Sequence, residues 1–206
     1  MEDYTTIEGR AEAEIEQKKS RFICALAHVE TEEQAQEFVQ SVREKHKAAR
    51  HNVHAWILRD GNRERCSDDG EPQKTAGLPT LETLRGAGVT DIAAVTTRYF
   101  GGTLLGTGGL VRAYTQAAQA ALANANIVLV SSCVDITIRI PYPFYDKIAY
   151  QVGQENTRVL DTSFTSEVQM TIRMLEGTQE RLLETIRQTL AGKGSIQVSD
   201  PLRTIF

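Results

Sequence analysis

In the last third of the chain, segments whose hydrophobic residues have strand spacing are interspersed with segments that have helix spacing. Hydrophobic and polar residues alternate strictly along residues 136–140 and again along residues 168–174, which predicts strands with one buried face. The other expected elements are strands over residues 157–164 and 196–198, a helix over residues 144–152, and a helix that opens at Gly177-Thr178 and is closed by Gly192. The predicted order is β-α-β-β-α-β, the split arrangement of a ferredoxin-like domain with two helices on one face of an antiparallel sheet.

The first 130 residues have a less regular pattern. Thr31 begins a capping box, which predicts a helix directly after it. Residues 54–58 are expected to form a strand that the turn at residues 60–62 folds back, and Thr75 is expected to cap a later short helix. Residues 92–97 form a nearly continuous apolar strand. We expect an α+β protein with two domains, residues 1–130 and residues 134–206.

A glycine-rich loop follows the apolar strand and leads into a helix with an alanine face. Its five glycines are Gly101, Gly102, Gly106, Gly108 and Gly109. Strand, glycine loop and helix form the arrangement that cradles phosphate, and here Arg98 and Arg112 are placed to flank one anion. The spacing matches neither a Walker loop nor a dinucleotide fingerprint. Three interpretations stay open: a tight turn that admits the alanine helix, a contact with a polymer or protein, and a small phosphate ligand.

A second dense polar segment carries three carboxylates in four residues, Asp68, Asp69 and Glu71. Such carboxylates can hold a divalent cation or raise one another's pKa for acid-base chemistry. They can equally belong to a structural turn or to a contact surface. Because this segment and the glycine loop are expected at one end of the domain, we expect the acids to face Arg98 and Arg112 across a cleft.

Lys18, Lys19 and Arg21 are the candidate nucleic-acid contacts, since cations beside an aromatic residue can touch phosphates and stack on a base. A solvated strand end is the alternative. His51 and His54 lie three residues apart, so on a strand they would face opposite sides and could not share one metal, whereas at a loop they could. No nucleophile motif is present. We therefore expect no catalytic residue, no resident metal and no cofactor.

Composition narrows the class of partner. The chain has 23 basic and 27 acidic residues and a net charge of -4, which argues against a protein whose whole surface grips nucleic acid. The three cysteines are widely spaced and encode neither a zinc site nor a disulfide framework. No apolar stretch approaches the roughly 20 residues of a membrane span. We expect a cytoplasmic protein without a membrane partner, and one that does not read DNA sequence.

Four separated motifs resemble those of the IMPACT family. They lie at residues 19–23, 49–56, 67–79 and 95–114, in the family's order, and the match spans about residues 18 to 122. The resemblance implies an N-terminal domain like the second domain of ribosomal protein five of the small subunit, a mixed sheet with helices on one face. The N-terminal domain and the ferredoxin-like C-terminal domain together resemble the fourth and fifth domains of elongation factor G.

The resemblance also implies a function. Eukaryotic relatives regulate translation by binding the activator of a starvation-responsive kinase, so we expect a non-enzymatic regulator that binds the ribosome, RNA or a translation-associated protein. The alternative is an enzyme that acts on a phosphorylated metabolite, with the glycine loop as anion cradle and the acids holding a metal. A binder requires an exposed basic surface, whereas an enzyme requires a pocket that encloses the loop and the acids.

Overall fold

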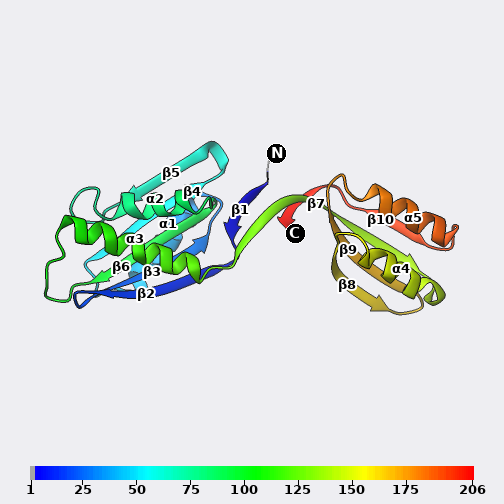
Figure 1. Ribbon diagram of the computed structural model, residues 1–206, viewed down its shortest axis with the longest axis horizontal. Coiled ribbons are helices and arrows are strands. Elements are labelled where there is room, and N and C mark those ends of the chain that lie inside the picture. The colour runs from blue at the N-terminus through cyan, green and yellow to red at the C-terminus, as the bar shows by residue number, and fades with distance from the viewer. Residues whose placement is uncertain (1–2) are drawn as a thin grey trace. The chain divides into compact units, whose positions relative to one another are not determined.

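The computed structural model describes residues 3–206 and shows an α+β protein with two sheets and five helices (Figure 1). The chain divides into two compact units, Tyr4–Val128 and Leu129–Phe206. None of the helices within residues 3–206 is both long and apolar enough to cross a membrane. The expected α+β class is confirmed.

The N-terminal unit contains a five-stranded sheet with the order β2-β3-β6-β4-β5. Its strands are β2 (Arg10–Gln17), β3 (Ser20–His28), β4 (His51–Leu58), β5 (Arg63–Ser67) and β6 (Ile92–Tyr99). Its helices are α1 (Glu32–Lys45), α2 (Gly77–Gly86) and α3 (Thr107–Ala123). Thr31 caps α1 as expected, because its side chain accepts a hydrogen bond from the Gln34 backbone N–H.

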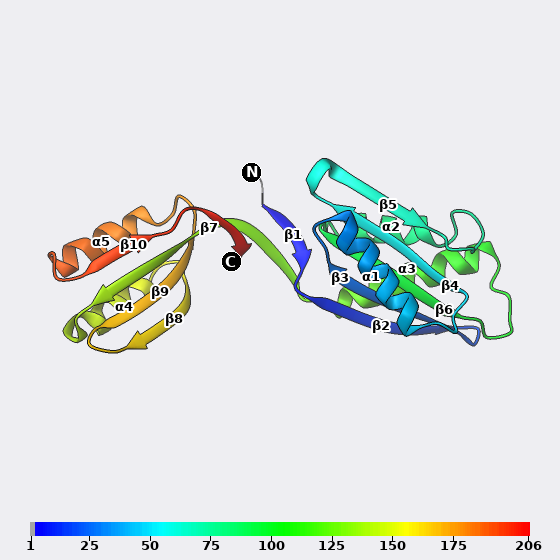
Figure 2. The ribbon, with the colours of Figure 1, turned by 180° about the vertical axis from the view of Figure 1, so that it is seen from behind.

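Two details of the expected N-terminal fold are wrong. Every strand pair within the five-stranded sheet is antiparallel, so the sheet is not mixed. Helices cover both faces, with α1 on one and α2 and α3 on the other (Figure 2). The physical reason lies in β3, where Cys24 and Leu26 pack under α3 while Ala25 and Ala27 pack under α1. A strand that is apolar at every position needs cover on both sides.

The C-terminal unit follows the predicted order of elements. Its elements are β7 (Ile127–Ile140), α4 (Tyr145–Gly153), β8 (Arg158–Phe164), β9 (Val168–Leu175), α5 (Glu180–Leu190) and β10 (Ser195–Val198). β7 pairs antiparallel with β9 and β10, and β8 pairs antiparallel with β9. Isoleucines of β7 pack with the apolar faces of α4 and α5 in one core. The sequence pattern missed β11 (Leu202–Ile205), which pairs antiparallel with β7. A further short strand, β1 (Tyr4–Ile7), belongs to the N-terminal unit.

Candidate functional site

The three carboxylates of the acidic segment do not share one site, because each has different partners. Asp68 caps the start of α2, where its carboxylate accepts the backbone N–H groups of Lys74, Ala76 and Gly77 at 2.8, 3.0 and 2.8 Å. This cap replaces the one expected from Thr75. The Asp68 carboxylate is thereby occupied in holding the loop before α2 against the helix.

Asp69 joins the same loop to α1 and β4. Its carboxylate forms an ion pair with Arg43 at 2.6 Å and accepts the Asn52 backbone N–H at 2.7 Å. The Asp69 backbone is left-handed, with φ of 43°, and its carbonyl oxygen lies 2.9 Å from His51 Nδ1. These contacts fix the loop but leave the carboxylate little capacity for a cation.

Glu71 is the acid that meets the glycine-loop strand. Its Oε1 accepts hydrogen bonds from Arg98 Nη1 at 2.7 Å and from the Tyr114 hydroxyl at 2.8 Å. The Glu71 and Arg98 side chains are only 4% and 8% exposed. Burial, together with the adjacent Glu71 charge, raises the pKa of Tyr114, so the phenol stays a proton donor. This buried triad ties the acidic loop to β6 and α3.

Arg98 is therefore a structural cation. Its guanidinium lies 5.5 Å from the centre of the Phe22 ring and 5.6 Å from that of Phe100. Glu71 and Arg98 meet as expected, but Arg112 does not join them, and Asp68 and Asp69 turn to other partners. Within residues 3–206 no group of three His, Cys, Asp or Glu side chains is arranged to hold a metal ion.

The glycine loop is packed against the turn between β2 and β3. A Cβ atom at Gly101 would overlap the backbone carbonyl of Lys19, and the Gly101 N–H donates to Ser20 Oγ at 3.1 Å. Gly102 and Gly106 have positive φ values of 84° and 72°, a region that favours glycine. Gly101, Gly102 and Gly106 are thus explained by close approach and backbone conformation.

The same end of the domain presents exposed cations and exposed apolar side chains. Lys18 and Lys19 form the β2–β3 turn, and Arg112 lies exposed in the second turn of α3. None of these three cations forms an ion pair within residues 3–206. Phe100 and Leu104 on the glycine loop are 57% and 81% exposed. We call residues 17–21 and 99–112 the basic end.

Arg21 differs from the other cations of the basic end. Its guanidinium pairs with Glu14 at 2.7 Å and lies 5.7 Å from the centre of the Tyr99 ring. Because Glu14 already offsets its charge, Arg21 offers less to an incoming anion than Lys18, Lys19 or Arg112. The candidate contact set therefore changes: Arg112 joins the turn lysines, and Arg98 leaves the exposed surface.

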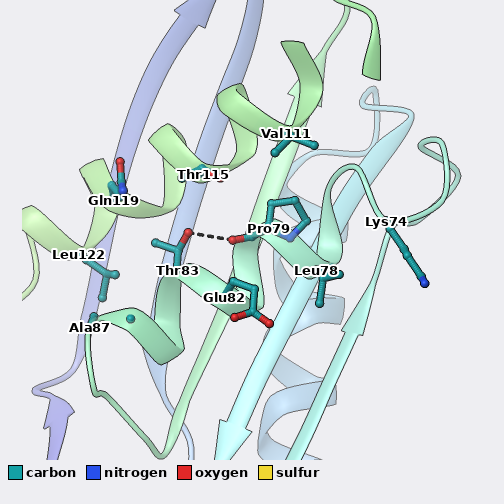
Figure 3. Close-up of a pocket in the computed structure, with 11 residues that line it drawn as sticks. Lys74, Leu78, Pro79, Glu82, Thr83, Ala87, Val111, Thr115, Gln119 and Leu122 are labelled. Carbon is teal, nitrogen blue, oxygen red and sulfur yellow. Dashed lines mark hydrogen bonds between the residues drawn. The ribbon is translucent and has the colours of Figure 1, made fainter. Parts of the chain in front are cut away.

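A groove between α2 and α3 was missed by sequence reasoning (Figure 3). It has a volume of about 770 Å³, and Leu78, Pro79, Val111 and Leu122 supply its apolar lining. Some apolar residues of α2 and α3 do not pack into the core and line this groove instead. The sequence does not show that the two helices lie side by side, so it does not predict the groove. None of the three acids or five loop glycines lines this groove. It is therefore not the pocket that an enzyme with an acidic metal site and a glycine cradle requires.

Comparison with known proteins places this geometry in a family. Residues 18–122 match the Impact N-terminal domain, and residues 138–193 match a domain of unknown function, DUF1949. IMPACT family member YvyE of Bacillus subtilis (strain 168) is 33% identical over 96% of this chain and 91% of its own length. YigZ of Escherichia coli (strain K12) is 40% identical over 76% of this chain and 78% of its own.

A solved structure described as a hypothetical protein is similar over most of both chains. It covers 97% of this chain and 98% of its own, with 33% identity and a TM-score of 0.62. The motifs of the acidic loop, β6 and the glycine loop all lie within the matched N-terminal domain. The chain belongs to the IMPACT family.

Proposed function

We propose that this protein is a non-enzymatic regulator of translation that binds RNA, on the ribosome or free, through the basic end of its N-terminal domain. The observation that carries the proposal is the set of unpaired cations, Lys18, Lys19 and Arg112, beside the exposed side chains of Phe100 and Leu104. Cations that contact phosphates, placed beside an aromatic ring such as Phe100 that can accept a stacked base, are typical of surfaces that bind single strands.

Charge distribution supports a local contact over a general affinity for anions. The chain as a whole carries a net charge of -4, so its long-range field repels nucleic acid. The three unpaired cations of the basic end lie on the β2–β3 turn and on α3, which the Gln17–Gln116 hydrogen bond joins. A phosphate backbone that reaches this end meets three cations that are not engaged in ion pairs within residues 3–206.

The arrangement of the acids argues against the alternative enzyme. Asp68, Asp69 and Glu71 hold a helix start, a loop and a buried arginine, respectively. An enzyme that used them to bind a metal would first have to break these contacts. A translation-associated protein remains the alternative partner, and the exposed Leu104 is the feature that such a partner would bury.

Co-sedimentation of the full chain with ribosomes tests the proposal. Binding should be measurable at low salt and should weaken steeply as salt rises, because displaced counterions drive association with phosphates. Lys147→Gln is the control variant, because it removes one exposed charge from α4, outside the basic end, and should leave co-sedimentation unchanged. Sedimentation that does not depend on salt, or its absence at low salt, would contradict the proposal.

A further inference from the structure

A small hollow lies between the β2–β3 turn and α3. It has a volume of about 110 Å³ and is lined by Gln17, Lys18, Leu105, Gly109, Arg112 and Gln116. Two of these six residues are cations, two are amides, and none is an acid. Neither Lys18 nor Arg112 forms an ion pair elsewhere within residues 3–206. Two like charges share the rim of one cavity, and an anion between them would relieve their repulsion.

The volume of the hollow decides which anion fits. About 110 Å³ equals the share of roughly three to four liquid waters at about 30 Å³ each. Pockets for whole metabolites or nucleotides are larger, about 300 to 1,000 Å³. The hollow therefore admits one phosphate group and leaves the rest of any larger ligand outside, as a contact to a polymer backbone does.

The two sides of the hollow are held in place before any ligand arrives. Gln17 at the end of β2 donates to the Gln116 side chain on α3 at 3.0 Å. Close packing of Gly101 on Lys19 fixes the turn against the glycine loop. Arg112 Nη1 would lie 3.7 Å from a Cβ placed at Gly108, so the guanidinium extends back along the first turn of α3.

The turn itself carries an unusual pair of residues. Lys18 and Lys19 both adopt left-handed backbone conformations, with φ of 47° and 65°. A two-residue hairpin turn with two positive φ values favours Asn-Gly, and other side chains there add strain. Lysine is unfavourable at both positions because of the left-handed backbone. We infer that the two lysines serve through their charged side chains.

We propose that the hollow seats one phosphate of a single-stranded RNA backbone, held from opposite sides by Lys18 and Arg112. The proposal rests on the proposed RNA-binding function and names its central contact. Inorganic phosphate presents the same chemistry, so the test has one arm for each source.

The RNA arm measures fluorescence anisotropy of a labelled single-stranded RNA with the full chain. Lys18→Asn and Arg112→Gln should each weaken binding about tenfold, as expected for loss of one charge-assisted contact. Because both side chains hold the same phosphate, the double variant should lose far less than the hundredfold that independent sites would give. Its plot of log affinity against log salt should be shallower by about 0.7, the value for one phosphate on a single strand.

Three controls separate binding from folding. Lys147→Gln should leave the affinity unchanged, Arg112→Lys should keep most of it, and thermal unfolding should show that Lys18→Asn is at least as stable as the parent. Arg21→Gln combined with Arg112→Gln should be closer to additive, since Arg21 pairs with Glu14 and does not line the hollow. Additivity of Lys18→Asn with Arg112→Gln would overturn the shared seat.

The phosphate arm titrates inorganic phosphate into the full chain and follows amide resonances of residues 17–18 and 109–112. Saturable shifts that disappear in the double variant support the seat. If phosphate binds there and RNA does not bind, the seat stands and the RNA function fails. If RNA binds the double variant as tightly as the parent, the seat fails and the RNA function stands. If neither ligand binds the parent chain, both are overturned.

Discussion

Glu71→Gln should destabilise the N-terminal domain strongly, because it leaves the buried Arg98 charge without a counter-charge. Oε1 of Glu71 accepts from Arg98 at 2.7 Å and from Tyr114 at 2.8 Å, with both charged side chains less than one-tenth exposed. Removing one member of a buried ion pair costs about 3 to 5 kcal/mol. The glutamine oxygen can still accept both hydrogen bonds, so we expect a loss near the lower end, about 3 kcal/mol.

Urea unfolding followed by tryptophan fluorescence measures this loss, because Trp56 is the single tryptophan and lies in the same domain. Tyr114→Phe removes one hydrogen bond to the same carboxylate and should cost about 1.5 to 3 kcal/mol. Arg112→Ala is the matched arginine control: it is exposed and without an ion pair, so its change should stay within about 0.5 kcal/mol. A larger loss for Arg112→Ala than for Glu71→Gln would refute the assignment of Arg98 as the structural cation.

Three further predictions concern the turn, the glycine loop and a half-buried histidine. Lys18→Asn with Lys19→Gly should raise the free energy of unfolding by about 1 to 2 kcal/mol while RNA affinity falls, and a parallel fall in both would contradict a binding role for the turn. Gly101→Ala should cost more stability in urea unfolding than Gly102→Ala, because only Gly101 has the Lys19 backbone against it. Burial lowers the pKa of His54, so the unfolded chain binds a proton at this histidine more readily than the folded chain. The free energy of unfolding should therefore decrease as the pH drops below about 6.5. His54→Gln should reduce this decrease in thermal melts between about pH 7.5 and 5.5.

The C-terminal domain could be predicted almost element by element, because its two central strands, β7 and β9, have one buried face and its helices have apolar stripes. Alternation along β9 and along residues 134–140 of β7 distinguishes core from surface, and the apolar stripe of α5 ends where the helix ends. β11 was missed because its four residues show no alternation of buried and exposed positions and so give no periodic signal.

The N-terminal sheet was harder to predict because strands that are apolar at nearly every position do not indicate which face of the sheet each residue lies on. The continuous apolar run of β6 already required cover on both faces, and the helix α1 supplies the second layer. The capping box of α1 was readable because its signal is local.

The roles of the candidate site residues depended on long-range pairing. Nothing in the spacing of Asp68, Asp69 and Glu71 shows that one caps a helix, one pairs with α1 and one is buried beside Arg98. Arg98 and Arg112 have different roles because their side chains point in different directions. The Arg98 side chain on β6 points toward Phe22 and Glu71, whereas Arg112 lies on the side of α3 opposite the alanine face.

Ultraviolet cross-linking of the full chain to ribosomes, followed by mass spectrometric mapping of the adducts, tests the central claim most directly. The basic end should carry the adducts, with Phe100 foremost, since its exposed ring is placed to stack on a base. The same adducts should decline as salt rises and in the Lys18→Asn, Arg112→Gln variant. Adducts confined to residues 129–206, or none at a salt concentration where the chain co-sediments, would contradict binding of RNA through the basic end.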